Sequence, residues 1–387
     1  MRTNPRLRVG VVMNTFVRSE GVNAGGHVHV FEVVERWLEL SLDVVVFAPA
    51  FVRDEVKKRL PSVEFIAMPS IEPPTGGRIV PFLSRAASAL LRRAELRRCD
   101  ALFASSQLLP DVVPLLCARK AARVVFIAHV LEAPWQRRGS LLRNALASVG
   151  EDLGLRVSNI GAGAIVTCSH FVAAQLRLRG MHQPCYVSTN GAGHVRRSYG
   201  PGERSGGVSV ARLHPVKGVE DLIRAWRKVV DAIPGATLTI VGDGEPAYRE
   251  RLEALGRSLD LEGRLIFAGS IDDATRDELL ARSAIFMFAS YEEGWGIAVA
   301  EALTASLPCV TYDLPIFQEI FPRGRLAAPV GDIGALASHA ITLLRDASLR
   351  DKLAKEASEL SEQFSWEHAA VVDARALLET LLRSLHA

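Results

Sequence analysis

Short runs that are apolar at almost every position recur along the chain, and they constrain the fold more than any other feature. Most are separated by longer segments of helical period, and Gly, Pro or Asn residues bound them. A strand that is apolar on both sides must be covered on both faces, as in a parallel sheet between helices. We therefore predict α/β architecture. The expected strands are LRVGVVMN, DVVVFAP, ARVVFIAH, AIVTCS, GVSVAR, TLTIVGDG, RLIFAGS, AIFMFAS and PCVTYD.

The length of 387 residues exceeds what one hydrophobic core normally supports, so we expect two domains. Gly, Ser, Asn and Pro crowd residues 188–207, which predicts the linker there. We place one Rossmann-like domain at 1–195 and a second at 205–365. A final helix, 366–387, carries an apolar stripe that needs a groove, and from the residues alone either domain could provide one.

The charge balance gives no reason to expect a nucleic-acid partner. The 46 Lys and Arg residues face 43 Asp and Glu residues, for a net charge of +3. Five cysteines form no C-x-x-C pair, which favours a reducing compartment. The chain shows neither a signal-peptide core nor a long apolar span. We expect a cytoplasmic protein, and the Ala- and Arg-rich composition suggests a bacterial source.

Loops that follow strands are the first places to search for a site, because ligands of open parallel sheets bind at the carboxyl ends of strands. Gly25 and Gly26 precede a predicted helix, where they suit either an anion or an ordinary tight turn. Arg212 and Lys217 lie where another helix opens. Two cations there can cradle a diphosphate, although solvated surface residues would look the same.

The stretch YEEGWGIAVAEAL places Glu293 before a helix predicted to start near Gly296, and Glu301 one turn or more inside it. We interpret the two carboxylates as hydroxyl-binding groups on either side of an anion held by the amides of residues 295–298. The alternative is that they only complement the helix dipole. His129, at the end of a first-domain strand, is either functional or satisfied by backbone groups.

Four segments of the second half occur in an order and spacing that indicates a known family. They are VARLHPVKG, IVGDGE, IFAGSI and SYEEGWGIAVAEALTASLPCVTY. Together they resemble the C-terminal domain of the family 4 retaining glycosyltransferases, which have the GT-B fold. AGGHVHV, AHV, CSHFVAAQL and STNGAG extend the resemblance more weakly into the first half. The resemblance implies two Rossmann-like domains that face each other across a cleft. It also implies that the last helix crosses back to the first domain.

The resemblance also implies roles for single residues. Arg212 and Lys217 would grip the diphosphate of a UDP- or GDP-linked sugar, Glu293 would bind the sugar and Glu301 the ribose. His129 would face the transferred sugar from the first domain. No metal or other cofactor is then required. The expected donor-binding residues are Gly25, Gly26, Gly242, Ile271, Trp295, Gly296, Ile297, Ala298 and Glu301.

Two departures from the family pattern leave the donor sugar open. The chain reads YDLPIFQE where relatives often have two glycines and an acid, and Trp295 replaces the usual phenylalanine. A sugar-nucleotide epimerase and a non-catalytic sugar-nucleotide-binding protein remain alternatives to a transferase.

The acceptor follows less directly from the sequence. Glu132 and Asp111 could make the first-domain cleft acidic and suited to an amino sugar or aminocyclitol, and a glycan is the other option. The segment 81–100 is rich in arginine, but we expect a solvated helix rather than a membrane contact, because no Leu-rich face is evident. The sequence does not predict an oligomeric state.

Overall fold

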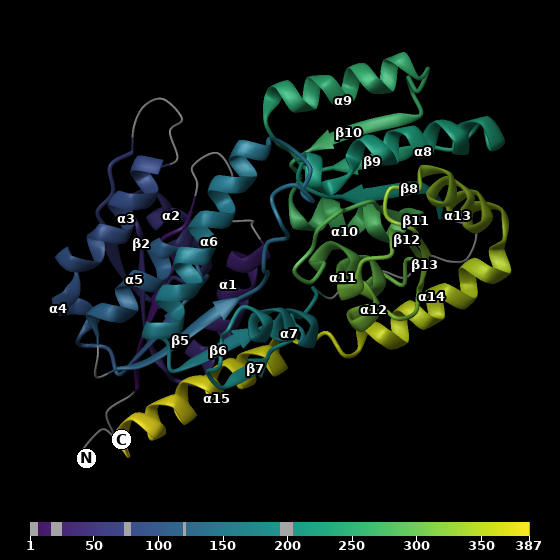
Figure 1. Ribbon diagram of the computed structural model, residues 1–387. Coiled ribbons are helices and arrows are strands. Elements are labelled where there is room, and N and C mark those ends of the chain that lie inside the picture. The colour runs from purple at the N-terminus through teal and green to yellow at the C-terminus, as the bar shows by residue number, and fades with distance from the viewer. Residues whose placement is uncertain (1–6, 17–24, 73–78, 119–120, 194–203, 387) are drawn as a thin grey trace. The chain divides into compact units, whose positions relative to one another are not determined.

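The computed structural model describes residues 7–16, 25–72, 79–118, 121–193 and 204–386 (Figure 1). The chain divides into two compact units. Unit 1 contains residues 1–134, 142–190 and 366–387, and unit 2 contains residues 135–141 and 191–365. Residues 135–141 therefore group with unit 2, although we had assigned them to the first domain. Part of the predicted linker, residues 194–203, lies outside the described residues.

Unit 1 is built on a parallel sheet of seven strands in the order β3-β2-β1-β4-β5-β6-β7. The order reverses between β1 and β4, which lie side by side in the sheet. Such a reversal opens a crevice at the carboxyl ends of the two strands. The strands are β1 (Arg8–Val12), β2 (Asp43–Pro49), β3 (Glu64–Met68), β4 (Ala101–Ala104), β5 (Ala122–Ile127), β6 (Ala164–Thr167) and β7 (Cys185–Val187).

Helices cover both faces of this sheet. The core of one face takes side chains from α3 (Ile79–Leu91), α4 (Arg93–Leu96), α5 (Leu109–Cys117), α6 (Leu141–Gly161) and α7 (His170–Leu178). The other helices of the unit are η1 (Ala50–Val52), α2 (Arg53–Arg59), α1 (Gly25–Glu39) and the C-terminal α15 (Trp366–Leu385). The expected basic helix over 81–100 is thus two helices.

The C-terminal helix packs on unit 1, as the resemblance implied. The indole N–H of Trp37 in α1 donates to the carbonyl of Ala370 in α15 at 2.9 Å. His29 is fully buried between the same two helices, with Nε2 at 2.8 Å from Oδ2 of Asp373. Its Nδ1 lies 2.6 Å from Oδ1 of Asn190. Buried polar groups need such partners, so these contacts fix where α15 docks.

Unit 2 contains a second parallel sheet, of six strands in the order β10-β9-β8-β11-β12-β13. Here the order reverses between β8 and β11. The strands are β8 (Ser205–Val210), β9 (Leu238–Val241), β10 (Leu265–Gly269), β11 (Ser283–Phe288), β12 (Cys309–Tyr312) and β13 (Arg325–Ala328). The helices are η2 (Pro215–Lys217), α8 (Val219–Ala232), α9 (Pro246–Ser258), α10 (Asp273–Arg282), α11 (Ile297–Thr304), α12 (Pro315–Ile320), α13 (Ile333–Arg345) and α14 (Ala347–Ser361).

The core of unit 2 is centred on α8, whose apolar residues recur at helical spacing. Leu222, Trp226 and Val229 all face inward and are completely buried. The Trp226 ring fills the space above Gly207 in β8, where a Cβ atom would lie only 3.0 Å from it. The core is therefore filled at this point, and shortening the side chain would leave a cavity.

We predict that Trp226→Ala lowers the free energy of unfolding of unit 2 by about 3 to 5 kcal/mol, because it removes a fully buried ring. Trp135→Ala is the matched control, since Trp135 is 78% exposed and its loss should cost less than about 0.5 kcal/mol. Urea unfolding followed by circular dichroism measures both values. Equal effects of the two substitutions would contradict the packing described here.

Candidate functional site

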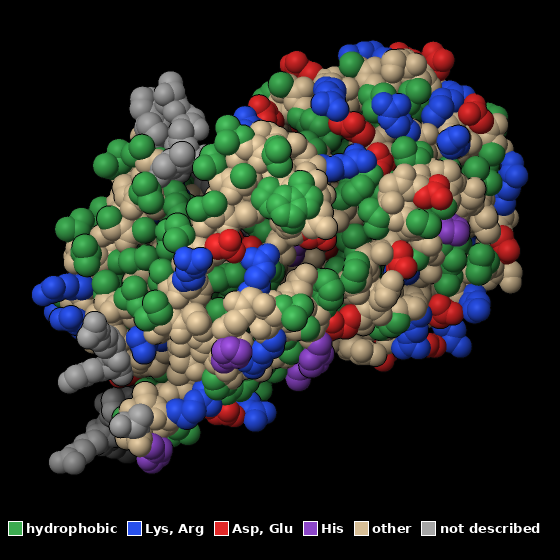
Figure 2. Space-filling model, in the orientation of Figure 1, with side chains coloured by type: hydrophobic (Ala, Val, Ile, Leu, Met, Phe, Trp, Pro, Cys, Tyr) green, Lys and Arg blue, Asp and Glu red, His purple; other side chains and the backbone are tan. Residues whose placement is uncertain are grey.

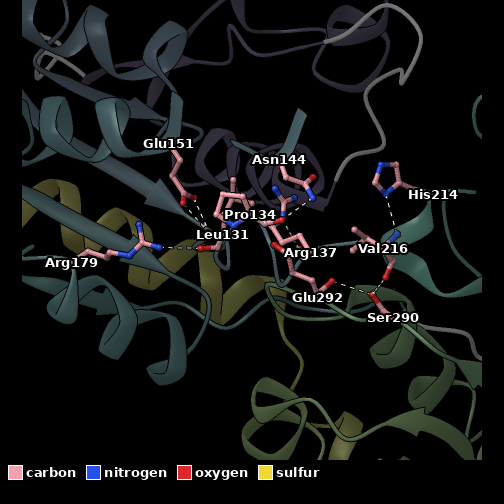
Figure 3. Close-up of polar contacts among 10 residues, drawn as sticks. All are labelled: Leu131, Pro134, Arg137, Asn144, Glu151, Arg179, His214, Val216, Ser290 and Glu292. Atoms are coloured by element: carbon pink, nitrogen blue, oxygen red, sulfur yellow. Dashed lines mark hydrogen bonds and ion pairs between the residues drawn. The ribbon is translucent and has the colours of Figure 1, made fainter. Parts of the chain in front are cut away.

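The loops after β8 and β11 meet at the carboxyl edge of the unit 2 sheet, where the strand order reverses. The amide of Tyr291 donates to the carbonyl of Val216 at 2.8 Å. The Ser290 hydroxyl bridges the carbonyls of Val216 and Glu292 (Figure 3). The two loops therefore touch through their backbones, and the side chains they carry lie together.

Gly218 is the residue that permits this contact. Its φ is +62°, and a Cβ atom there would lie 1.9 Å from the carbonyl oxygen of Ala289. Only glycine fits, because a side chain would both strain the backbone and collide with the neighbouring loop. Gly218 also ends η2 and caps α8, so the same residue sets the direction of that helix.

Lys217 and Glu293, one from each loop, form an ion pair at this meeting point. The Lys217 Nζ atom lies 2.5 Å from Glu293 Oε1, and the side chains are only 20% and 10% exposed. An ammonium group has three N–H donors and a carboxylate has two oxygens, so each keeps capacity for a further partner. The pair can present donors to an anion and an acceptor to a hydroxyl at neighbouring points.

Arg212 lies further back on the loop after β8, and its side chain is exposed. The backbone on both sides of it contacts the loop after β9, since Leu213 N donates to Asp243 O at 2.9 Å. Gly242 has a structural reason to be glycine, because a Cβ atom there would lie 2.0 Å from the carbonyl oxygen of Ala211. The loop that carries Arg212 is thus held from both sides.

Helix α11 begins at Ile297 with Gly296 as its N-cap, which confirms the predicted start. Gly296 has φ +106°, and a Cβ atom would lie 2.8 Å from the Phe317 ring. The amides of Ile297 and Ala298 are in the first turn, where the helix itself offers no acceptor. They are available to an anion, and α11 adds its dipole.

Trp295 faces away from such a ligand. Its side chain is 3% exposed and packs edge-on against Phe321 and Phe364, with ring centroids 5.6 and 5.2 Å away. The Trp295 indole N–H has no hydrogen-bond partner among the described residues. Any donor contact from Trp295 would therefore come from its backbone, while the ring holds the turn before α11 in place.

Glu301 lies inside α11 and faces Arg276 on α10. The Oε1 atom is 3.3 Å from Arg276 Nη1, and burial raises the pKa of Glu301 to about 7 despite this cation. Arg276 also contacts Asp273 and Asp277. Arg276 could not be predicted from the sequence, since its partner is 25 positions away. Ile271 is half-buried in the loop between β10 and α10.

Sequence reasoning also missed two arginines in residues 135–141. Arg137 Nε donates to Glu292 Oε2 at 2.8 Å (Figure 3). Glu292 is next to Glu293 in the chain. The Arg138 guanidinium lies 3.7 Å from the centroid of the Tyr291 ring. The Tyr291 hydroxyl donates in turn to Asp221 Oδ2. Adjacent Arg-Arg and Glu-Glu pairs were visible in the sequence, but nothing in it indicated that they meet.

In unit 1, His129 follows β5 and is half-buried. Its carbonyl accepts a hydrogen bond of 2.8 Å from Gln107 Nε2. Glu151 on α6, which is 1% exposed, accepts from the same Gln107. It also accepts from the Leu131 amide, as Figure 3 shows. A buried carboxylate therefore fixes the loop that carries His129, and burial raises the pKa of Glu151. Neither Gln107 nor Glu151 was predicted.

The other expected residues of unit 1 occupy different environments. Gly25 and Gly26 are the first residues of α1, whereas we expected them to precede the helix. A Cβ atom at Gly26 would meet nothing within 4 Å, so the helix is open on that side. Glu132 is exposed, as an acceptor-facing residue must be.

Asp111 does not line an open cleft, which corrects our expectation. It is completely buried, and burial raises its pKa to about 6. Its carboxylate accepts hydrogen bonds from Ser105, Ser106, Thr15 and the Asn14 amide. Four donors occupy its acceptor capacity, so Asp111 holds the loops after β1 and β4 together.

Across the described residues, no three His, Cys, Asp or Glu side chains are grouped so that they could hold a metal ion. Among the same residues, no helix is long and apolar enough to cross a membrane.

Both halves of the chain match models of glycosyltransferase families. The family model of "Glycosyl transferases group 1" matches residues 201–360, and the model of "Glycosyltransferase Family 4" matches residues 24–193. The chain belongs to glycosyltransferase family 4. The predicted family is thereby confirmed.

Two curated relatives match part of the chain. N-acetyl-alpha-D-glucosaminyl L-malate synthase of Bacillus anthracis is 32% identical over 163 residues, 41% of this chain and 42% of the relative. Phosphatidyl-myo-inositol mannosyltransferase of Mycolicibacterium smegmatis is 35% identical over 157 residues, 39% of each chain. The matches thus span about two fifths of the length of these relatives.

Solved structures confirm the GT-B fold. Sucrose-phosphate synthase from Thermosynechococcus elongatus superimposes with a TM-score of 0.80 at 18% identity, covering 98% of this chain and all of the other. Anabaena HepE in complex with UDP and glucose gives 0.77 at 18% identity, covering 97% of this chain and all of the other. At these identities the likeness concerns the fold.

We predict that Gly218→Ala destabilises unit 2 more than Gly263→Ala does. Both glycines have positive φ, but Gly263 has nothing within 4 Å of a Cβ atom, whereas Gly218 would collide with Ala289. Backbone strain costs roughly 1 to 2 kcal/mol at each position, and the collision adds to it only at Gly218. Thermal unfolding compares the two. The same loss at both positions would mean that contact between the loops does not constrain the site.

Proposed function

We propose that this protein transfers a sugar from a nucleotide-diphosphate sugar to an acceptor hydroxyl, with retention of configuration. The observation that carries the proposal is the Lys217–Glu293 pair at the strand-order reversal of unit 2, where Glu293 lies in the loop that leads into α11. Cation, carboxylate and free helix amides are what a diphosphate bonded to a sugar requires. Membership of the family supports the reaction class.

The leaving group is the nucleoside diphosphate. As the anomeric bond breaks, negative charge grows on the diphosphate and positive charge on the sugar ring. Lys217, Arg212 and the first-turn amides of α11 would stabilise that negative charge before it develops. No metal ion is needed in this scheme. Anabaena HepE holds UDP, which supports a UDP-linked donor, and a GDP-linked donor is the second option.

The two glutamates would bind hydroxyl groups. Glu293 is next to Lys217, so it would accept hydrogen bonds from the sugar that is attached to the diphosphate. Glu301 would accept from the ribose hydroxyls when it is ionised. The Arg276 guanidinium, 3.3 Å from Glu301, favours that ionised form.

The acceptor would bind in unit 1, where His129 would face the transferred sugar. The acceptor hydroxyl would enter on the face that the diphosphate leaves, and a phosphate oxygen would take its proton. We propose an amino sugar, an aminocyclitol or a glycan as acceptor, in the cytoplasm of a bacterium. Glu132 is the exposed acid that would meet a cationic acceptor, since Asp111 is buried.

Arg212→Ala should lower kcat by roughly a hundredfold or more, about 3 kcal/mol in the barrier, because it removes a cation from the leaving group. Arg251→Ala is the control, as the Arg251 side chain is 67% exposed and pairs with Glu220. Product formation from UDP- and GDP-sugars with a panel of acceptors measures the effect. A wild-type rate in the Arg212 variant would remove this residue from the mechanism.

The same assay without acceptor separates a transferase from an epimerase. We expect the donor to stay intact until an acceptor is added. Conversion of the sugar nucleotide in the absence of acceptor would contradict the proposed transfer and favour epimerisation.

We predict that nucleotide binding depends on the ionisation of Glu301. Below its pKa of about 7 the carboxyl group becomes protonated and loses its charge-assisted hydrogen bonds to the ribose. The affinity for UDP should therefore fall as pH drops through 7, by up to about tenfold per unit. Glu301→Gln should bind more weakly above pH 7 and respond less to pH. Calorimetric titration checks this, and parallel pH profiles for both proteins would refute it.

A further inference from the structure

Helix α6 in unit 1 has its polar and apolar faces reversed relative to an ordinary surface helix. The side that faces the fold carries small and polar residues, while the side that faces solvent carries aliphatic ones. The buried residues are Asn144, Glu151, Gly154, Leu155, Ser158 and Gly161. Besides Leu141 at the helix start, which is 62% exposed, the exposed aliphatic residues are Leu142, Leu146, Val149, Leu153 and Ile160, which are between 45% and 78% exposed.

Leu142, Leu146, Val149, Leu153 and Ile160 form a stripe along one side of the helix, with a gap of two turns between Leu153 and Ile160. Their spacing of four, three, four and seven residues keeps them on one side of a helix with 3.6 residues per turn. The stripe is about 27 Å long at 1.5 Å per residue. The inner face is polar because its residues hold neighbouring loops. Glu151 accepts hydrogen bonds from Gln107 and the Leu131 amide, and Gly154 lies against the Gln107 carbonyl. Those contacts do not explain five aliphatic residues facing water.

Helix α3 carries a second outward stripe on the same face of the unit 1 sheet. Val80, Leu83, Leu90 and Leu91 are between 52% and 70% exposed. Helix α5 connects the two stripes, since α3 packs on α5 and Gly161 of α6 lies against Leu116 of α5. Figure 2 shows hydrophobic side chains gathered over this part of the molecule. Our expectation that no Leu-rich face accompanies the arginines of residues 81–100 is therefore wrong.

Exposed arginines border this aliphatic face. Arg93 lies in α4 and Arg98 two residues after its end, while Arg143 and Arg156 flank the stripe on α6. The acids of these helices are already engaged, Glu95 with Arg92, Asp152 with Arg179, and Glu151 inside the fold. The border of the face is therefore positively charged. Arg85 does not contribute, because it is buried against Glu72.

We propose that the outward faces of α3 and α6 dock onto an anionic membrane surface. The aliphatic stripes would enter the boundary between headgroups and acyl chains, and the arginines would meet the phosphates, as in helices that lie in the plane of an interface. A second copy of the chain fits less well. Symmetric pairing would bring the same arginines of both copies to one interface, and none of the exposed apolar side chains that form the stripes is an aromatic anchor.

Sedimentation of the full-length chain with vesicles tests this proposal. We expect the protein to sediment with vesicles that contain phosphatidylglycerol and phosphatidylcholine, and to remain in solution with phosphatidylcholine alone. The double variant Leu146→Gln/Leu153→Gln should bind at least roughly tenfold more weakly, since two inserted side chains become polar. Leu382→Gln on α15 is the matched control, because Leu382 is 55% exposed and Leu146 is 53% exposed. It should bind like the wild type.

A second variant tests the charged border. Arg93→Glu/Arg98→Glu should lose most of the binding, and added salt should weaken the wild type. The melting temperatures of all variants should match the wild type, because every changed side chain is exposed.

Three results would overturn the proposal. One is absence of wild-type binding to the phosphatidylglycerol vesicles, and another is unchanged binding by the Leu146/Leu153 variant. The third is a wild-type dimer in light scattering that the Leu146/Leu153 variant converts to a monomer, which would assign the face to a second copy.

Discussion

The direct backbone contact between the loops after β8 and β11 is the constraint on which the candidate site depends. A crevice opens where the connections after two neighbouring parallel strands lead to opposite sides of the sheet, and these two loops meet at that point. Gly218 makes the contact possible, and the hydrogen bond from Tyr291 N to Val216 O fixes its register. Lys217 and Glu293 are brought together as a consequence. Without the contact, two residues 76 positions apart would have no reason to form a pair.

A second ion pair lies next to the Lys217–Glu293 pair in the chain. The side chains of Lys217 and Glu293 are 20% and 10% exposed, and those of Arg137 and Glu292 are 14% and 6% exposed. Pairing offsets the cost of burying these groups, so they help to hold the loop in one conformation. Asp221 adds to this support through the hydroxyls of Tyr291 and Tyr312. These contacts hold Lys217 and Glu293 in position, so that the two side chains can meet a ligand without reorganising.

The sequence predicted central strands and helix starts better than edges and partners. The expected strands correspond to β1, β2, β5, β6 and β8 to β12, because continuous apolar runs are visible without knowledge of the fold. It missed three of the four edge strands, β3, β7 and β13, which are only partly buried, and β4, which has four residues. The start of α11 was predictable from Gly296, since a positive φ needs a residue of that type.

Partners that are distant in sequence were not predictable, for a physical reason. Only the tertiary fold brings these partners within reach of each other. Arg276 and Arg137 each meet a carboxylate, and Glu151 meets an amide. The buried face of helix α6 was also not predictable from its sequence. Its sequence is apolar at helical spacing, which ordinarily marks the buried face, yet the fold buries the opposite face because Glu151 must reach the loop of His129.

The proposed function requires that a diphosphate binds in unit 2 between the Lys217–Glu293 pair, Arg212 and the first turn of α11. A crystal structure of the full chain soaked with UDP tests it most directly. We expect diphosphate oxygens within about 3 Å of Lys217 Nζ and of the amides of Ile297 and Ala298. UDP bound elsewhere, or bound here with both Lys217 and Arg212 turned toward solvent, would contradict it.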